Sequence, residues 1–186
     1  MPVNPWKVPQ DIADLANAVQ EKHHMPRLAT ASVVLCFDDS KPYIRNKINF
    51  GKVFKFNELN KLWHVQKHDF CIVLCSDLWY SLLIDSQREA LIDLQLTRCE
   101  VEYVPVKVEI NGKKKTVKDQ WGRIEYTDEF KLNDNGEVIW KVSPLDLSVF
   151  TKNVRRYDLW FNELLDLKDA IANSVGNANT DLPESV

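Results

Sequence analysis

Two histidines four residues apart, His64 and His68, are a pair whose spacing could support metal chemistry. They lie in the segment "WHVQKHD", and Asp69 follows the second one directly. If residues 57–68 form a helix capped by Asn57, both imidazoles would lie on one helix face beside a carboxylate. Histidines in contact with solvent explain the same pattern, and that is the default interpretation. The alternative of an active metallopeptidase with unconventional ligands therefore stays open.

A second candidate is a thiol. Cys99 directly follows Arg98, whose charge could lower the pKa of the thiol and make it a nucleophile. No histidine lies near it in the sequence, so a packing role is favoured. The four cysteines all lie in apolar segments and form no CxxC pair, which indicates buried free thiols in a reducing cytosol; they are Cys36, Cys71, Cys75 and Cys99.

A third candidate is the basic cluster "NGKKKTVK" at residues 111–118, the tip of an expected hairpin. It could contact phosphate or an acidic partner, although a solvated tip explains it equally well. A nucleic-acid-binding module that uses Arg98, this tip and exposed tryptophans is a further alternative, and steep salt dependence of binding would support it. The formal net charge of −3 argues against bulk attraction to nucleic acid.

Six tryptophans could pack in a core or anchor a partner. Trp79 and Trp160 fit core positions. The other four lie in expected connectors or hairpins, where an aromatic side chain can serve as a binding anchor: Trp6, Trp63, Trp121 and Trp140. For each one taken singly, core packing is the favoured role.

We expect both helices and strands to position these residues. Apolar residues recur at helical spacing over residues 10–23, and Pro9 fits the first turn of that helix. Apolar or alternating segments predict three strands, the last of them the most apolar and therefore central: residues 31–37, 51–56 and 69–75.

The next helix is predicted to run from Ser86, which has capping-box spacing to Glu89, to about Val101. Residues 104–142 then alternate by two around the turn candidates "NGK" and "NDNG", which indicates hairpins.

Two C-terminal helices are predicted, over residues 144–156 and 158–175, the first of them starting at Ser143 and Pro144 as N-cap and first helical residue. The tail, residues 176–186, has little to bury and is expected to be disordered. The length suits one domain, residues 1–175, in which residues 104–142 form a hairpin insertion. No segment resembles a signal peptide or a membrane span, so we expect no membrane association.

The segment "REALIDLQLTRCEVE" in the expected helix, together with its surroundings, resembles the putative phage metallopeptidase family. This is a zincin-like group related in style to SprT-type proteases. The resemblance covers roughly residues 8–160 and includes "GKVFKF", "HDFCIVLCSDLWYSL", "NDNGEVIWKVSPLDLSVF" and "VRRYDLW". It implies a zincin-like α+β fold, with a small mixed sheet and a former active-site helix.

A zincin helix carries H-E-x-x-H, in which two histidines hold Zn²⁺ and the glutamate activates water. By the resemblance, the first histidine falls on Leu94, the glutamate on Gln95 and the second histidine on Arg98. The third ligand falls on Leu145. Leucine offers a metal no lone pair, an amide is not a usable base, and a permanent cation repels a dication. The sequence therefore predicts no catalytic residue, no cofactor and no zinc hydrolysis at this place.

The function predicted from these residues is binding without catalysis. We expect a phage or prophage protein in the cytoplasm of a bacterial host. It would bind and inhibit a host or phage protein, for instance a factor in defence or DNA metabolism. The candidate binding residues are those of the former site and two tryptophans: Leu94, Gln95, Arg98, Leu145, Trp140 and Trp121. Arg98 is expected to bind a carboxylate or phosphate of the partner, so that Arg98→Ala weakens binding and leaves the fold intact.

Overall fold

The protein is built around a four-stranded sheet. The computed structural model describes residues 5–44, 47–57, 67–82, 84–110, 112–145, 147–158 and 160. The strands lie in the order β1 (Trp6–Lys7), β2 (Val33–Asp38), β6 (Phe70–Cys75) and β5 (Lys52–Lys55). The two inner strands are parallel, and the outer two pair antiparallel to them. All three predicted strands are confirmed, and the most apolar one, β6, lies inside the sheet as expected. A short hairpin, β3 (Tyr43–Ile44) and β4 (Lys47–Ile48), lies outside this sheet.

The register of β2 and β6 explains why one face of the sheet is covered. Leu35 lies opposite Ile72 and Phe37 opposite Leu74, and all four are buried. Because successive side chains in a strand point to opposite faces, these residues share one face. The alternate residue Cys36 points the other way and is only half-buried.

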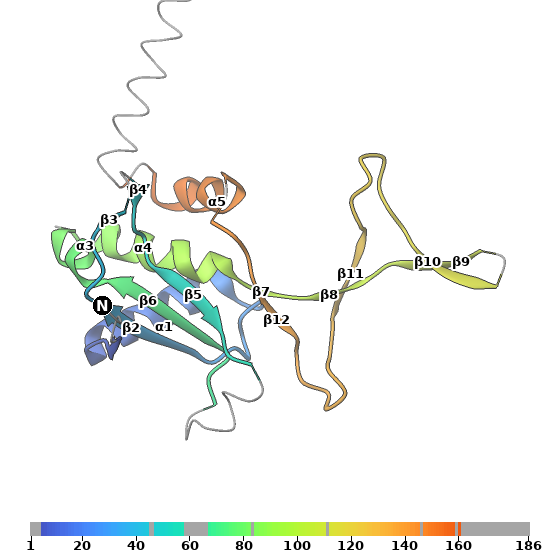
Figure 1. Cartoon of the computed structure of the whole chain (residues 1–186), viewed down its shortest axis with the longest axis horizontal. Coiled ribbons are helices and arrows are strands. Elements are labelled where there is room, and N and C mark those ends of the chain that lie inside the picture. Colours follow the sequence, from blue (N-terminus) through green and yellow to red (C-terminus); the bar gives the residue numbers. More distant parts are fainter. Residues whose placement is uncertain are drawn as a thin grey trace, which may run out of the picture.

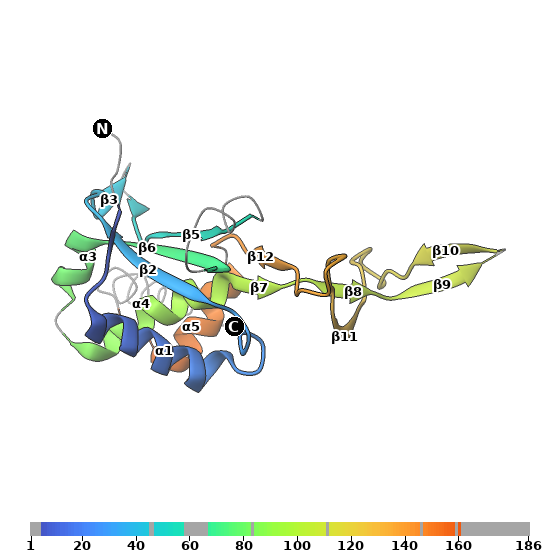
Figure 2. The ribbon, with the colours of Figure 1, turned by 90° about the horizontal axis from the view of Figure 1, so that it is seen from below.

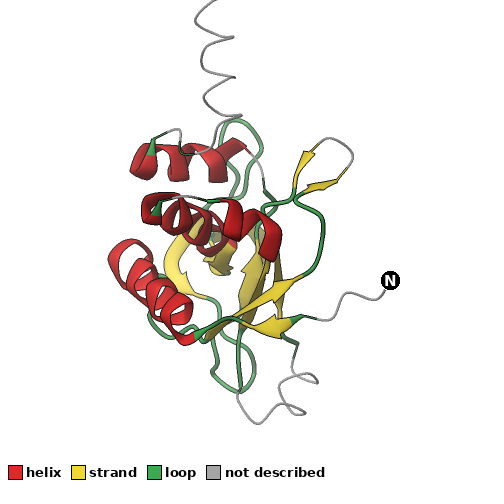
Figure 3. Ribbon diagram, turned by 90° about the vertical axis from the view of Figure 1, so that its left-hand side faces the viewer, coloured by secondary structure: helices red, strands yellow, loops and turns green. Residues whose placement is uncertain are grey.

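Three helices pack on one side of this sheet (Figures 2 and 3). They are α1 (Gln10–His24), α4 (Asp85–Arg98) and α5 (Leu147–Tyr157); a shorter helix, α3 (Ser76–Ser81), follows β6 directly. The middle helix, α4, packs against both α1 and α5. Every residue from Ala90 to Thr97 is buried, as expected for a helix enclosed on all sides. The predicted helix over residues 10–23 is confirmed, and so is the mixed α+β class.

The start of α4 differs from the prediction. The helix begins at Asp85, and the capping box expected between Ser86 and Glu89 does not form. Instead the side-chain oxygen of Gln87 accepts a hydrogen bond from the backbone amide of Ile84, at 3.4 Å. Isoleucine has no polar side-chain atom, so only this half of a capping box is present.

The end of α4 also differs, because residues 99–101 are a strand and not the last helical turn. This strand, β7 (Cys99–Val101), pairs antiparallel with β12 (Trp140–Val142). The amide of Ser143 extends the pairing by donating to the carbonyl of Arg98, at 2.8 Å. The predicted helix start at Ser143 and Pro144 is therefore wrong, and α5 begins at Leu147.

A long projection leaves the body between β7 and β12 (Figure 1). We define residues 102–139 as the arm. It contains β8 (Tyr103–Pro105) paired with β11 (Tyr126–Phe130), and β9 (Lys107–Ile110) paired with β10 (Lys113–Thr116). Isolated bridges join Lys118 to Ile124 and Leu132 to Val138. The predicted hairpins are thus confirmed, with turns at Gly112 and Gly136, whose φ angles of 72° and 79° favour glycine.

Some predictions concern residues beyond those described. The helix over 158–175 falls outside them except for residues 158 and 160, and the tail at 176–186 falls outside entirely. The division into a domain of residues 1–175 and a tail stays a prediction. Within the described part of the chain, none of the helices combines the length and the hydropathy needed to cross a bilayer.

Candidate functional site

Gln95 and Arg98 form a hydrogen-bonded pair on the inner face of α4. The guanidinium Nη1 of Arg98 donates to Oε1 of Gln95 at 2.9 Å, and its Nε donates to the carbonyl of Ser143 at 3.2 Å. The amide Nε2 of Gln95 donates to the carbonyl of Phe50 at 2.6 Å. Gln95 is fully buried, so both ends of its side chain are satisfied inside the protein. This Gln95–Arg98 pair links α4 to the segment before β5 and to the end of β12.

The charge of Arg98 persists in this setting. Burial lowers the pKa of its guanidinium, but arginine loses its proton only far above neutral pH. Because a guanidinium has donors and no acceptor, the orientation of the Gln95 amide follows: its oxygen faces Arg98 and its nitrogen faces Phe50.

The two leucines assigned to ligand positions lie in different surroundings. Leu94 is fully buried in the core, whereas Leu145 is 36% exposed beside Pro144. Neither side chain has an electron pair to donate. Among the described residues, no group of three histidine, cysteine, aspartate or glutamate side chains could hold a metal ion. The side chains at this place do not fit a zinc ion, since they supply two hydrocarbons, an amide with both ends occupied and a cation.

The tryptophans proposed as anchors are also separated. Trp140 is buried in β12 and stacks edge-on against Phe70, with ring centroids 5.6 Å apart. Trp121 lies in the arm and is 69% exposed, with the Arg123 guanidinium over its ring at 4.7 Å. Trp79 and Trp160 are buried, as predicted.

The alternative metal site at His64 and His68 lies only partly within the described residues. His64 lies outside the described residues. Nδ1 of His68 lies 2.9 Å from the hydroxyl oxygen of Ser32, and a carboxylate oxygen of Asp69 accepts the backbone amide of Ser32 at 2.9 Å. Both residues thus help fix the start of β2, which is a structural role.

A buried polar cluster on the opposite side of α4 was not found from the sequence. Asp93 is fully buried and accepts three side-chain hydrogen bonds. They come from Nε2 of His24 at 2.8 Å, from Nδ2 of Asn153 at 2.8 Å, and from Nη1 of Arg156. Asn153 also accepts the indole N–H of Trp160 at 2.7 Å. The cluster therefore connects α1, α4 and α5.

The protonation of His24 follows from its neighbours. Nη2 of Arg27 lies 2.8 Å from Nδ1 of His24, and a guanidinium can only donate. Nδ1 must then accept, so the imidazole is neutral and its Nε2 carries the hydrogen donated to Asp93. In agreement, burial lowers the pKa of His24 against the opposing effect of Asp93.

The pKa of Asp93 reflects a balance of two effects. Burial on its own would raise it, but hydrogen bonds from His24 and Asn153 and the charge of Arg156 outweigh burial and leave it lowered. The hint in the sequence was an acidic residue within the apolar run Ala90–Leu94 of the helix.

The thiol candidate is not activated. Cys99 is fully buried, and burial raises the pKa of its thiol to about 12 in spite of the nearby charges of Arg27 and Arg98. A thiol with this pKa is almost wholly protonated at neutral pH and is a weak nucleophile. The predicted packing role therefore stands.

The arm carries an unusual share of the exposed apolar surface. Of the twelve large hydrophobic residues that are exposed among those described, six lie in the arm: Val108, Trp121, Ile124, Tyr126, Phe130 and Leu132. A hollow of about 360 Å³ lies where the hairpins of the arm meet, with Tyr103, Ile124 and Tyr126 in its lining. Both features are typical of a surface that binds another macromolecule.

The chain matches a known protein family. The family model described as putative phage metallopeptidase matches residues 5–173, which includes the helices, the sheet and the arm. Neither curated proteins nor solved structures give a significant match.

Proposed function

Because the chain belongs to the putative phage metallopeptidase family, we propose that it is a non-catalytic member that acts by binding another protein. In this proposal residues 1–175 form one domain with a zincin-like plan. The hydrophobic and charged residues at the former metal positions stabilise that domain instead of holding zinc. The bound protein would be a host or phage factor that is sequestered or inhibited.

The observation that carries the proposal is the Gln95–Arg98 pair. Catalysis by a zincin needs a base beside the metal and an open coordination position. Here the side chain in the place of the base donates one hydrogen bond to Phe50 and accepts another from Arg98. A residue so engaged cannot take a proton from water. The same contacts tie α4 to its neighbours, which is a use for these residues that needs no substrate.

The burial of the former site also limits where a partner can bind. Leu94, Gln95 and Trp140 are each at most 5% exposed, so they cannot contact another molecule without rearrangement. Leu145 is 36% exposed, but the arm offers more exposed aromatic surface, since Trp121 and Tyr126 are 69% and 57% exposed. An aromatic side chain exposed to this extent can lose much apolar area to a partner, which is why such residues dominate binding energy in many interfaces.

The first test separates binding from hydrolysis. Purified protein is assayed on a fluorescent casein substrate with added zinc, with and without a chelator. We expect no hydrolysis that the chelator abolishes. Chelator-sensitive hydrolysis that His64→Ala also removes would instead establish an active enzyme with unconventional ligands.

The second test locates the binding surface. Affinity capture from bacterial lysate is compared for the wild type, Trp121→Ala, Tyr126→Ala and the control Tyr80→Ala. Tyr80 is a suitable control because it is 64% exposed but lies in α3 on the body. We expect a specific protein to be lost with both arm variants and kept with the control. Retention by the arm variants, or capture of no specific protein, would contradict the proposal.

A further inference from the structure

Opposite charges are separated along the arm. We define residues 107–118 as the basic tip; they contain five lysines and one glutamate, a formal net charge of +4. We define residues 119–137 as the acidic branch; they contain six acidic and two basic residues, a formal net charge of −4. Each part is strongly charged although the whole chain carries only −3.

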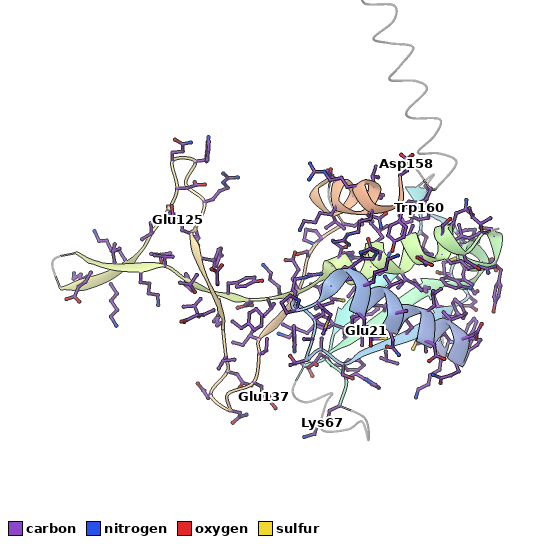
Figure 4. The ribbon with its side chains drawn as sticks, turned by 180° about the vertical axis from the view of Figure 1, so that it is seen from behind. Glu21, Lys67, Glu125, Glu137, Asp158 and Trp160 are labelled. Atoms are coloured by element: carbon purple, nitrogen blue, oxygen red, sulfur yellow. The ribbon has the colours of Figure 1, made fainter. Side chains whose placement is uncertain are left out.

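The base of the basic tip meets the acidic branch, since Lys118 bridges Ile124 and the amide of Glu125 donates to the carbonyl of Val117 at 3.1 Å. Lys113, Lys114 and Lys115 lie farther out, in the β9–β10 ribbon. The β9–β10 ribbon points away from the body at the far end of the arm (Figure 1). The acidic branch forms two other hairpins, which lie nearer the body. Glu125 and Glu137 lie on these two hairpins, on opposite sides of the arm (Figure 4). The β9–β10 ribbon is paired over four residues on each strand.

The charges are also largely unpaired. Lys113, Lys114 and Lys115 are exposed. Lys114 lies opposite Glu109 in the ribbon, but within the described part of the chain none of the three lysines forms an ion pair. The same holds for Asp128 and Glu129 in β11. Like charges held close together without partners repel one another, so each region is stabilised by an oppositely charged surface.

We propose that the arm binds the arm of a second copy of this chain, with the basic tip of each copy on the acidic branch of the other. This inference rests on the proposed function, since both assign protein binding to the arm. A two-fold axis makes such a contact self-complementary, because both charge pairs form at once. The exposed aromatic residues lie in the acidic branch, so the partner's tip would also cover apolar surface there.

A nucleic-acid duplex fits the arm less well. The lysines of the tip would attract phosphates, and a two-stranded ribbon has the width of a major groove. However, the acidic branch follows the tip directly in the chain, and its net charge of −4 would repel the same duplex. A second copy uses both charged regions, whereas nucleic acid uses only one.

Charge reversal tests the dimer by loss and by rescue. The tip variant carries Lys113→Glu, Lys114→Glu and Lys115→Glu. The branch variant carries Glu125→Lys, Asp128→Lys and Glu129→Lys. The control variant carries the same change as the tip variant, but at exposed lysines of the body: Lys52→Glu, Lys55→Glu and Lys67→Glu. All these side chains are exposed, so the variants should fold, and circular dichroism checks this.

Sedimentation equilibrium then measures the dimer dissociation constant. We expect the wild type and the control variant to dimerise, and the tip and branch variants each to dissociate about tenfold or more readily, because like charges then face each other. Mixing the tip variant with the branch variant should restore the dimer, since both contacts in the mixed pair are again between opposite charges. Raising the salt from about 0.15 M to about 1 M should weaken the wild-type dimer.

Three results would overturn the dimer. A monomeric wild type would do so. A dimer that the tip and branch variants leave unchanged, or that mixing does not restore, would do so as well. The third result would come from fluorescence anisotropy with a labelled DNA duplex. If the wild type is a monomer that binds the duplex and the tip variant does not bind it, the basic tip binds nucleic acid. In each case, lysate capture that depends on Trp121 would still support the proposed function, so the two ideas fail separately.

Discussion

Replacing Asp93 by alanine should destabilise the protein by about 2–6 kcal/mol, because it leaves two buried hydrogen-bond donors without their acceptor, at about 1–3 kcal/mol each. The carboxylate is fully buried and accepts hydrogen bonds from His24, Asn153 and Arg156. The Arg156 side chain is 28% exposed and can turn to water. The other two donors cannot, because His24 is 2% exposed and Asn153 is fully buried.

Neither His24 nor Asn153 can reorient to reach another acceptor. Nδ1 of His24 accepts from Arg27, so the ring hydrogen must stay on Nε2, where no acceptor would remain. Asn153 cannot turn its amide over, because its oxygen accepts from Trp160 and its nitrogen also donates to the carbonyl of Ala90. Both donors would therefore stay without an acceptor, on which the range above depends.

Urea denaturation followed by tryptophan fluorescence gives the free energy of unfolding at a fixed protein concentration. The matched control is Asp85→Ala on the same helix, because the Asp85 side chain is 86% exposed in its contact with Arg88. The control should have a far smaller effect. If the two variants lose the same stability, the buried cluster around Asp93 does not exist as described.

The same cluster sets a dependence of stability on pH. The folded pKa of His24 is lowered from 6.5, so between the folded pKa and 6.5 the unfolded chain binds more protons. Stability is then fully present above about pH 6.5 and is lost as the pH falls towards the folded pKa. The lowered folded pKa of Asp93 adds a second loss of stability as the pH falls below 3.8, the ordinary pKa of an aspartate. His24→Gln keeps a donor and an acceptor without titrating, so urea denaturation at pH 7 and pH 5 should show a smaller pH effect for this variant than for the wild type. An unchanged pH effect would exclude His24 as its source.

The remaining predictions concern the Gln95–Arg98 pair and one glycine. Gln95→Ala should destabilise the protein by about 1–3 kcal/mol in urea, since it removes the hydrogen bonds from Gln95 to the carbonyl of Phe50 and from Nη1 of Arg98 to Gln95; a neutral result would mean that the pair contributes nothing to the fold. Arg98→Ala should lower stability as well, by about 1 kcal/mol or more, which differs from the sequence-based expectation of an unaffected fold. Gly51→Ala should lower the thermal midpoint far more than Gly112→Ala. Gly51 has a φ of 99°, and an added Cβ there would lie 2.4 Å from the carbonyl oxygen of Val73, whereas at Gly112 it meets open space. Equal shifts in the two melting curves would contradict that close approach.

The sequence predicted the elements whose patterns are local. Strands β2, β5 and β6 and helix α1 follow from apolar runs or periodicity that a short window contains. The strand at residues 99–101 was missed because its partner, β12, lies some forty residues later, and a long-range pairing replaced the helical pattern. The shifted start of α5 has the same origin, since Ser143 completes that pairing.

The geometry of the site could not be predicted from the sequence. By the family resemblance, the residue types at positions 94, 95 and 98 predict a helix without zinc ligands, and this stays a prediction. Nothing in the spacing showed that Gln95 donates to Phe50, which lies 45 residues away. The contact between His24 and Asp93 spans 69 residues. Such contacts depend on how the helices pack on the sheet, which sequence periodicity does not specify.

Zinc binding by the purified protein tests the central claim most directly. After equilibrium dialysis against zinc at neutral pH, the bound metal is measured by mass spectrometry, for the wild type and for Gln95→Ala. We expect well under stoichiometric zinc in both proteins, because the side chains near Gln95 and Arg98 supply no ligand set. A tightly held stoichiometric zinc in the wild type that Gln95→Ala loses would show that α4 still carries a metal site.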